Sequence, residues 1–284
     1  SRGLSTGLSI YAPSIILATI LGWDLTWTNI LMGSVVLIYT VSGGTKAISH
    51  THLQQMIIVT VAMFVAGYMV VHLLPAEVGF VDALKIAGKA GRLNTIDFHF
   101  DPNSRYNIWS GLSGGFFLQL SYFGTDQSQV GRYLTGESIG QSRLGLMMNG
   151  LLKIPMQFLI LLVGVLVFVY YQYNPSPLFF NKVETDKLKN SEYAADYQSL
   201  EQKHIASVEN QQVAVNGLAK AMDEGHEEEV KRWQASLKES DETQKSLKKE
   251  AVALIKKNNP TADTSDVNYV FLRFVLDRLP IGLI

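Results

Sequence analysis

The chain has 284 residues, of which 47% are hydrophobic and 17% are charged, and its formal net charge is −1. It contains no cysteine, which excludes disulfides, thiolate metal sites and cysteine nucleophiles. The near-neutral charge and the absence of a basic stripe indicate no nucleic-acid partner. The charges are unevenly spread, because 30 of the 49 Lys, Arg, Asp and Glu residues lie between Lys182 and Asp266. The sequence therefore joins a very apolar part to a highly charged insert.

Five apolar segments follow one another in the first part of the chain. Their approximate bounds are residues 4–22, 27–42, 54–74, 108–130 and 144–171. A helix needs about 20 mostly apolar residues to cross the hydrocarbon layer, and backbone polar groups in lipid must be bonded internally. A soluble bundle holds one such helix at its centre but hardly five in succession. We therefore expect an all-α membrane protein that crosses the lipid bilayer several times.

The short loops predict how these segments are oriented. Four basic residues lie at alternate segment ends, all on one side: Arg2, Lys46, Arg132 and Arg143. The positive-inside rule makes that side cytoplasmic, at an inner or plasma membrane. The loop over residues 74–107 then faces outward, although it carries four basic residues of its own: Lys85, Lys89, Arg92 and Arg105. These basic residues depart from the positive-inside rule. The acidic residues near them do not offset the departure, because Asp and Glu contribute little to the rule.

Residues 182–265 form the charged insert, which is rich in Glu, Lys, Gln and Ala, a composition that favours long helices. Gly217 and Gly225 interrupt an imperfect heptad pattern, which favours a helical hairpin over a single rod. The orientation above puts this extramembrane insert on the outer (periplasmic or extracellular) face. Two interpretations stay open: a solvated spacer without a binding role, and a coiled coil that docks a protein partner over residues 186–257.

The apolar segment over residues 108–130 carries polar side chains that a lipid-facing helix would avoid. Gln119, Tyr122 and Asp126 fall at i, i+3 and i+7, on one face of a helix. Such groups at membrane depth normally face a bundle interior or a wet cavity and mark a solute path. Glycines at 114, 115 and 124 weaken the helix and favour the unwinding typical of solute-binding helices. The alternatives are hydrogen bonding between helices for Gln119 and Tyr122, and an interfacial position for Asp126 and Gln127.

Lys153 is a second anomaly, because it lies inside the last apolar segment, with Asn149 one helical turn earlier. A buried ammonium group needs a carboxylate, carbonyl groups or a polar ligand. Pro155 removes the N–H that would bond the Leu151 carbonyl, which makes that carbonyl one candidate partner. A solute-binding role and a structural role are both open for Lys153.

Signatures of soluble enzymes are absent from the sequence. It has no Walker loop, no glycine-rich dinucleotide turn, no GxSxG elbow and no HExxH motif. His50 and His52 point to different faces of a helix and have no carboxylate nearby, so we assign no metal site to them. We expect neither an enzyme nor a bound cofactor.

Two motifs resemble those of the sodium:solute symporter family. Residues 123–134, Phe-Gly-Thr-Asp-Gln-Ser-Gln-Val-Gly-Arg-Tyr-Leu, resemble its helix-to-loop motif. Residues 39–47 and 51–55, Tyr-Thr-Val-Ser-Gly-Gly-Thr-Lys-Ala and Thr-His-Leu-Gln-Gln, resemble its YGG-x-x-A and TD-x-x-Q segments. The spacing from the first motif to Lys153 also matches. The resemblance covers residues 1–173 and 266–284, but not the insert.

The resemblance implies an inverted-repeat bundle of five plus five core helices, of which this internal fragment supplies helices three to seven. It implies alternating access with Na⁺ as the coupling ion. It implies solute contacts at Gln119 and Lys153, with Tyr122 and Phe123 closing the inner side of the site. Many members carry an Asp after the Thr of the fifth core helix, where this chain has His52 after Thr51. A sodium site that uses that carboxylate is therefore not expected, and the principal sodium ligands are expected outside this chain.

These observations predict a secondary active transporter that moves a small polar solute (a sugar, a sugar acid or a carboxylate) together with Na⁺. The predicted solute-binding residues are Gln119, Tyr122, Phe123, Asn149 and Lys153. The candidate pathway or coupling residues are Thr51, His52, Asp126 and Gln127. Three parts are predicted: transmembrane helices over 1–181, the insert over 182–265, and the start of another transmembrane helix over 266–284. The rival hypothesis is a membrane sensor or scaffold, in which a transporter-like bundle anchors the insert.

Overall fold

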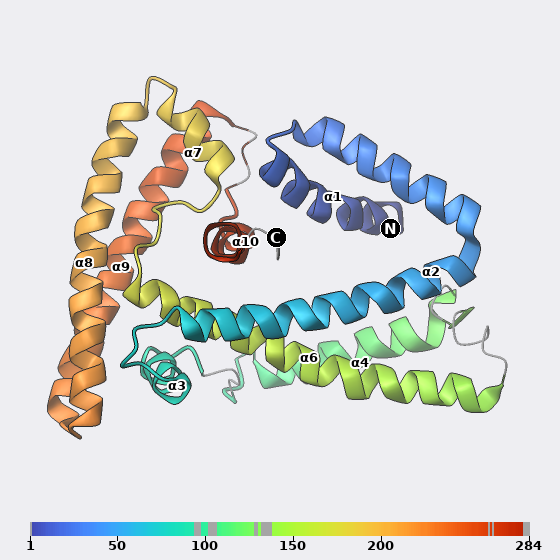
Figure 1. The fold of residues 1–284 in the computed structure, drawn as a ribbon, viewed down its shortest axis with the longest axis horizontal. Helices are drawn as coiled ribbons and strands as arrows, with labels where there is room; N and C mark the ends of the chain where they lie inside the picture. The colour runs from blue at the N-terminus through green and yellow to red at the C-terminus, as the bar shows by residue number, and fades with distance from the viewer. Residues whose placement is uncertain are drawn as a thin grey trace.

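The computed structural model describes residues 2–93, 98–101, 107–127, 130–131, 138–260, 262 and 264–280. Within these ranges the regular structure is helical, without strands (Figure 1). The helices of the apolar part are α1 (Arg2–Leu21), α2 (Leu25–His72), α3 (Phe80–Lys89), α4 (Ile108–Leu120), the π-helical turn η1 (Ser121–Thr125) and α6 (Ile139–Tyr173). Those of the charged part and the C-terminal end are α7 (Lys182–Lys189), α8 (Ala194–Asp223), α9 (Glu227–Asn258) and α10 (Val267–Arg278).

Three stretches of helix in the described residues are long and apolar enough to cross a membrane: Leu25–Gly44, His50–His72 and Ile139–Tyr173. The first two share the label α2, but a non-helical break at Gly44 divides them, so the two separate segments expected here are both present. Gly44 has φ 60° and ψ −169°, a conformation that glycine adopts without steric cost. Asp24 caps the start of α2, where its carboxylate accepts hydrogen bonds from the N–H groups of Thr26 and Trp27.

The apolar segment over residues 108–130 is an interrupted helix and not a single unbroken one. Asn107 and Ser110 form a reciprocal capping box at the start of α4. The α-helical pattern then changes to a π-helical turn at Ser121, and the backbone leaves helical geometry at Asp126, with φ −73° and ψ 103°. The helix is therefore interrupted beside Gly124, as its glycine content suggested, whereas the glycines at 114 and 115 stay within α4.

Helices α8 and α9 of the insert run side by side and antiparallel, and lie crosswise to α2 and α6 in Figure 1. Gly225, with φ 73°, makes the turn between them, and the His226 N–H bonds the Ala221 carbonyl across it at 3.0 Å. A second, smaller core holds α7 against the far end of this hairpin. Its fully buried side chains include Leu188, Tyr197, Ala251 and Ile255.

The main hydrophobic core crosses the boundary between the apolar part and the insert. Its members come from α2, α3, α6, α8, α9 and α10, and include Val70, Ile86, Leu166, Tyr170, Leu218, Leu237 and Phe274. Buried amide groups join the same two parts, because Gln211 of α8 donates to the Gln172 oxygen of α6 at 2.6 Å. The insert is therefore packed onto the Tyr173 end of α6.

Candidate functional site

A cavity of about 620 Å³ lies between the α4–η1 segment and α6. Gln119, from the last turn of α4, and Phe123, from η1, line one side. Asn149, Lys153 and Gln157 line the other side and fall at i, i+4 and i+8 of α6, so they share one helical face. The structure thus brings four of the five predicted solute-binding residues to a common cavity.

The local backbone explains these positions. In the π-helical turn the backbone bonds to the fifth residue rather than the fourth, which changes the direction of side chains after Ser121. Phe123 follows Gln119 by four residues, a spacing that places both on one helical face, and both line the cavity. On the other side, α6 continues as a helix through Pro155, so Lys153 and Gln157 keep helical spacing despite the missing proline N–H.

The cavity combines amide groups and one ammonium group with apolar walls. Leu146, Ile154, Phe158 and Leu161 supply most of its remaining surface. Within the part of the chain that the structure describes, Lys153 forms no ion pair. An ammonium group beside apolar walls favours a ligand that carries negative charge or several hydrogen-bond acceptors.

The sequence pattern of the Sodium:solute symporter family matches residues 5–197, more than half of the chain. The chain belongs to the sodium:solute symporter family. Together with the apolar helices, this membership makes it a multi-pass membrane protein from a family of transporters rather than enzymes. The family match extends into α7 and the start of α8, beyond the residues whose motifs suggested it.

Three members of the family illustrate the likeness. The chain is 32% identical to the human sodium/iodide cotransporter over 184 residues, which are 63% of this chain and 27% of that protein. It is 32% identical to the rabbit (Oryctolagus cuniculus) sodium-dependent multivitamin transporter over 174 residues, 60% of this chain and 26% of that protein. It is 34% identical to the human sodium-coupled monocarboxylate transporter 1 over 148 residues, which are 51% of this chain and 23% of that protein. The chain thus spans about a quarter of the length of these relatives.

In this member of the family, the remaining predicted residues lie outside the lining of the cavity. Tyr122 is exposed, and its ring packs edge-on against the Phe123 ring at 5.2 Å between centroids. The four candidate pathway residues also lie outside the lining: Asp126 and Gln127 just after η1, and Thr51 and His52 on α2 beyond its kink. The rest of the helix-to-loop motif, at 128–129 and 132–134, falls outside the described residues, as does Arg132 of the orientation argument.

Gln157 is the cavity residue that the sequence analysis missed. It follows Lys153 by four residues, so the helical spacing that linked Gln119 to Tyr122 and Asp126 also pointed to it. Its amide offers a donor and an acceptor in an otherwise apolar stretch, at the same cavity as the Lys153 ammonium group.

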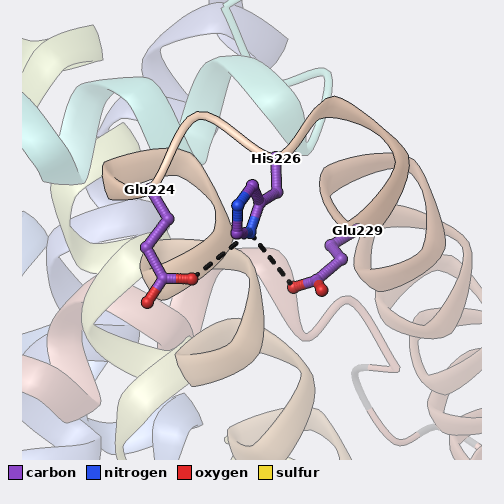
Figure 2. A group of neighbouring side chains, drawn as sticks. All are labelled: Glu224, His226 and Glu229. Carbon is purple, nitrogen blue, oxygen red and sulfur yellow. Dashed lines mark ion pairs between the residues drawn. The ribbon is translucent and has the colours of Figure 1, made fainter.

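One group of possible metal ligands is found among the described residues, far from the cavity in sequence. Glu224, His226 and Glu229 meet at the α8–α9 turn, with their ligand atoms within 4.8 Å of one another (Figure 2). The His226 Nδ1 atom lies 3.4 Å from a Glu224 oxygen and 4.0 Å from a Glu229 oxygen. All three side chains are exposed. Contacts of the imidazole with the two carboxylates account for the arrangement, and nothing else there indicates a metal.

Proposed function

We propose that this chain forms part of a symporter that couples Na⁺ to the uptake of a small polar solute, a sugar, a sugar acid or a carboxylate, by alternating access. The observation that carries the proposal is that Gln119 and Lys153 line one cavity, although they lie on different helices and 34 residues apart. The names of the relatives, which specify sodium, support the choice of ion.

In this proposal, the Gln119 amide and the Lys153 ammonium group hydrogen-bond the solute, with Asn149 beside them. Gln157 is added because its amide lines the same cavity. Phe123 and Tyr122, in edge-on contact, form a gate at the inner side of the site. The interruption of the helix at Asp126 supports this role, because a break in the backbone lets the segment change direction without unfolding α4.

The proposed architecture is the one expected from the resemblance. Residues 1–181 supply core helices three to seven of a five-plus-five inverted repeat, and residues 266–284 begin the next helix. Residues 182–265 form an outer-face insert, and a coiled coil with a protein partner is one of its two proposed roles. The principal Na⁺ ligands lie outside this chain, and Thr51, His52, Asp126 and Gln127 are candidates for the ion pathway. Coupling then requires that Na⁺ and solute have different affinities for the outward-open and inward-open states.

The test is uptake of solute into proteoliposomes that contain the full-length protein, with and without a sodium gradient. A hydrogen bond to a charged group contributes about 1.5–3 kcal/mol, so we expect Gln119→Ala and Lys153→Ala each to weaken solute binding by about tenfold or more. Leu152→Ala is the matched control, because Leu152 neighbours Lys153 but points away from the cavity. Undiminished uptake by the two cavity variants, in amounts of folded protein equal to wild type, refutes the assignment.

The second candidate function is a membrane sensor or scaffold in which the bundle anchors the insert. The observation that favours it is the core that the insert shares with α2, α3 and α6, since such a core can transmit movement between the two parts. A screen for sodium-dependent uptake by the full-length protein separates the two, because a sensor without transport activity accumulates no solute at any sodium gradient.

A further inference from the structure

A second cavity, of about 370 Å³, lies where the C-terminal end of α3 meets α6 and α9. It shares no lining residue with the cavity that holds Gln119 and Lys153. Its charged lining residues are Lys89, Arg92, Lys238 and Asp241. Lys89 and Arg92 belong to the loop whose basic residues conflict with the positive-inside rule, so this cavity gathers charges that the transport proposal does not use.

Backbone geometry holds Arg92 at this cavity. Helix α3 ends with the Arg92 N–H bonded to the Ala87 carbonyl at 2.9 Å, and Gly91 takes φ 74°. This is a Schellman ending, which needs a residue with positive φ and therefore favours glycine. The turn brings the guanidinium carbon to 4.5 Å from the centre of the Phe168 ring on α6. A guanidinium group stacked on an aromatic ring keeps its edge N–H groups available for an anion.

Helix α9 completes the cavity from the opposite side. The Gln234 side chain donates a hydrogen bond to the Lys89 carbonyl at 2.8 Å, which ties α9 to the end of α3. Lys238 follows Gln234 by one helical turn and so reaches the same cavity. The carboxylate of Asp241 is already paired with Lys245, at 2.6 Å.

The net charge around the cavity is positive. Within the described residues, none of Lys89, Arg92 and Lys238 forms an ion pair. Three cations around one hollow repel one another, and a bound anion relieves that repulsion while accepting hydrogen bonds from them. Arginine and lysine together are the side chains that proteins use for oxyanions such as phosphate.

We propose that this cavity is an accessory anion site that binds a phosphate-type oxyanion. Such a group is supplied either by free inorganic phosphate or by the headgroup of an acidic phospholipid. Helix α3 buries Ala83, Ile86 and Ala87 against the protein and leaves Phe80 and Val81 exposed beside the apolar helices α2 and α6, where lipid is available. The cavity at its end is thus within reach of both sources.

The test uses the full-length protein in two kinds of nanodisc, one of phosphatidylcholine alone and one of phosphatidylcholine with phosphatidylglycerol. Inorganic phosphate is titrated into the first at constant ionic strength, so that screening does not change. Amide hydrogen exchange over residues 86–92 and 234–241 reports occupancy, because a bound anion slows opening of the α3–α9 contact. Protection by phosphate in the neutral nanodiscs indicates a free anion, and protection only in the acidic nanodiscs indicates a lipid headgroup.

The variants separate the site from a general charge effect. Arg92→Gln and Lys238→Gln each weaken binding by about tenfold, since each removes a charged donor. Lys249→Gln, which removes an exposed charge from α9 away from the cavity, leaves the binding unchanged. Asp241→Asn removes the negative charge from the lining and tightens binding by about threefold, an outcome that a misfolded variant cannot mimic. The proposal is overturned by an absence of protection in both nanodiscs, by an equal loss in Lys249→Gln, or by weaker binding in Asp241→Asn.

Discussion

Gly217 of α8 lies against the side chain of Trp233 of α9. A Cβ atom added at Gly217 would lie 2.6 Å from Cδ2 and 2.7 Å from Cζ2 of the Trp233 ring, and would contact Cε2 as well. Carbon atoms in good contact are about 3.5–4.0 Å apart. Gly217→Ala therefore forces Trp233 or the two backbones to move.

The expected change in hairpin stability on Gly217→Ala has two opposing contributions. Overpacking of this kind costs about 1–3 kcal/mol, while alanine is about 1 kcal/mol better than glycine inside a helix. With Trp233 present, Gly217→Ala should destabilise the hairpin by about 0–2 kcal/mol. In the Trp233→Ala background the clash is gone, and the same change should stabilise the hairpin by about 1 kcal/mol. The double-mutant cycle should thus give a coupling energy of about 1–3 kcal/mol.

Amide hydrogen exchange of α8 and α9 in the full-length protein measures the free energy of local opening for each of the four variants. Asn216→Ala is the control, because Asn216 is exposed beside Gly217 and gains only helix propensity. A stabilising effect of Gly217→Ala of the same size with and without Trp233 would refute the close approach of the two helices.

Three further predictions concern polar contacts that hold the insert in place. His204 forms a hydrogen bond with the Ser176 carbonyl at 3.0 Å. Burial lowers the pKa of the His204 imidazole below the ordinary 6.5, so the unfolded chain binds a proton at this imidazole more readily than the folded chain does. Thermal melts should show stability that is fully present above about pH 6.5 and lost as the pH falls below it, a dependence absent in His204→Gln. Gln211→Leu leaves the buried Gln172 oxygen and the partly buried Gln244 amide without their partner. The unfolding free energy should therefore fall by about 1–3 kcal/mol for the buried Gln172 group, whereas Gln202→Leu at an exposed position should change it little. Lys248→Met leaves the buried Asp266 carboxylate without its cation and should speed hydrogen exchange at Phe180, whose N–H bonds that carboxylate; unchanged exchange there contradicts this role for the ion pair.

The parts of the fold that depend on local composition were predictable. A stretch such as 144–171 must be helical because lipid offers no partner for its backbone, and α6 spans it, starting five residues earlier at Ile139. Gln119, Asn149 and Lys153 stood out for a related reason, since polar groups in apolar segments are costly unless something hydrophilic lies beside them. Helical spacing places Asn149 and Lys153 on one face of α6, whereas their meeting with Gln119 depends on how α4 and α6 pack.

Other features depend on contacts that a local pattern cannot reveal. The break between the first two long apolar segments falls at Gly44, whose positive φ turns the chain, and the sequence alone did not single out that glycine. Leu218 and Leu237 look like scattered leucines of a solvated helix, yet they pack in one core with Leu166 of α6. The length of a charged helix says nothing about which distant surface its apolar residues will cover.

The core shared by α6 and the insert also imposes an order on biosynthesis. When the ribosome has released Tyr173, the residues that will cover that end of α6, among them Leu218 and Leu237, do not yet exist. About ten seconds pass before α9 has been translated at typical elongation rates. During that interval Leu166 and Tyr170 are without their final neighbours, so lipid, the insertion machinery or a chaperone must shelter them, and a ribosome that stalls before Leu237 leaves a nascent chain prone to aggregation.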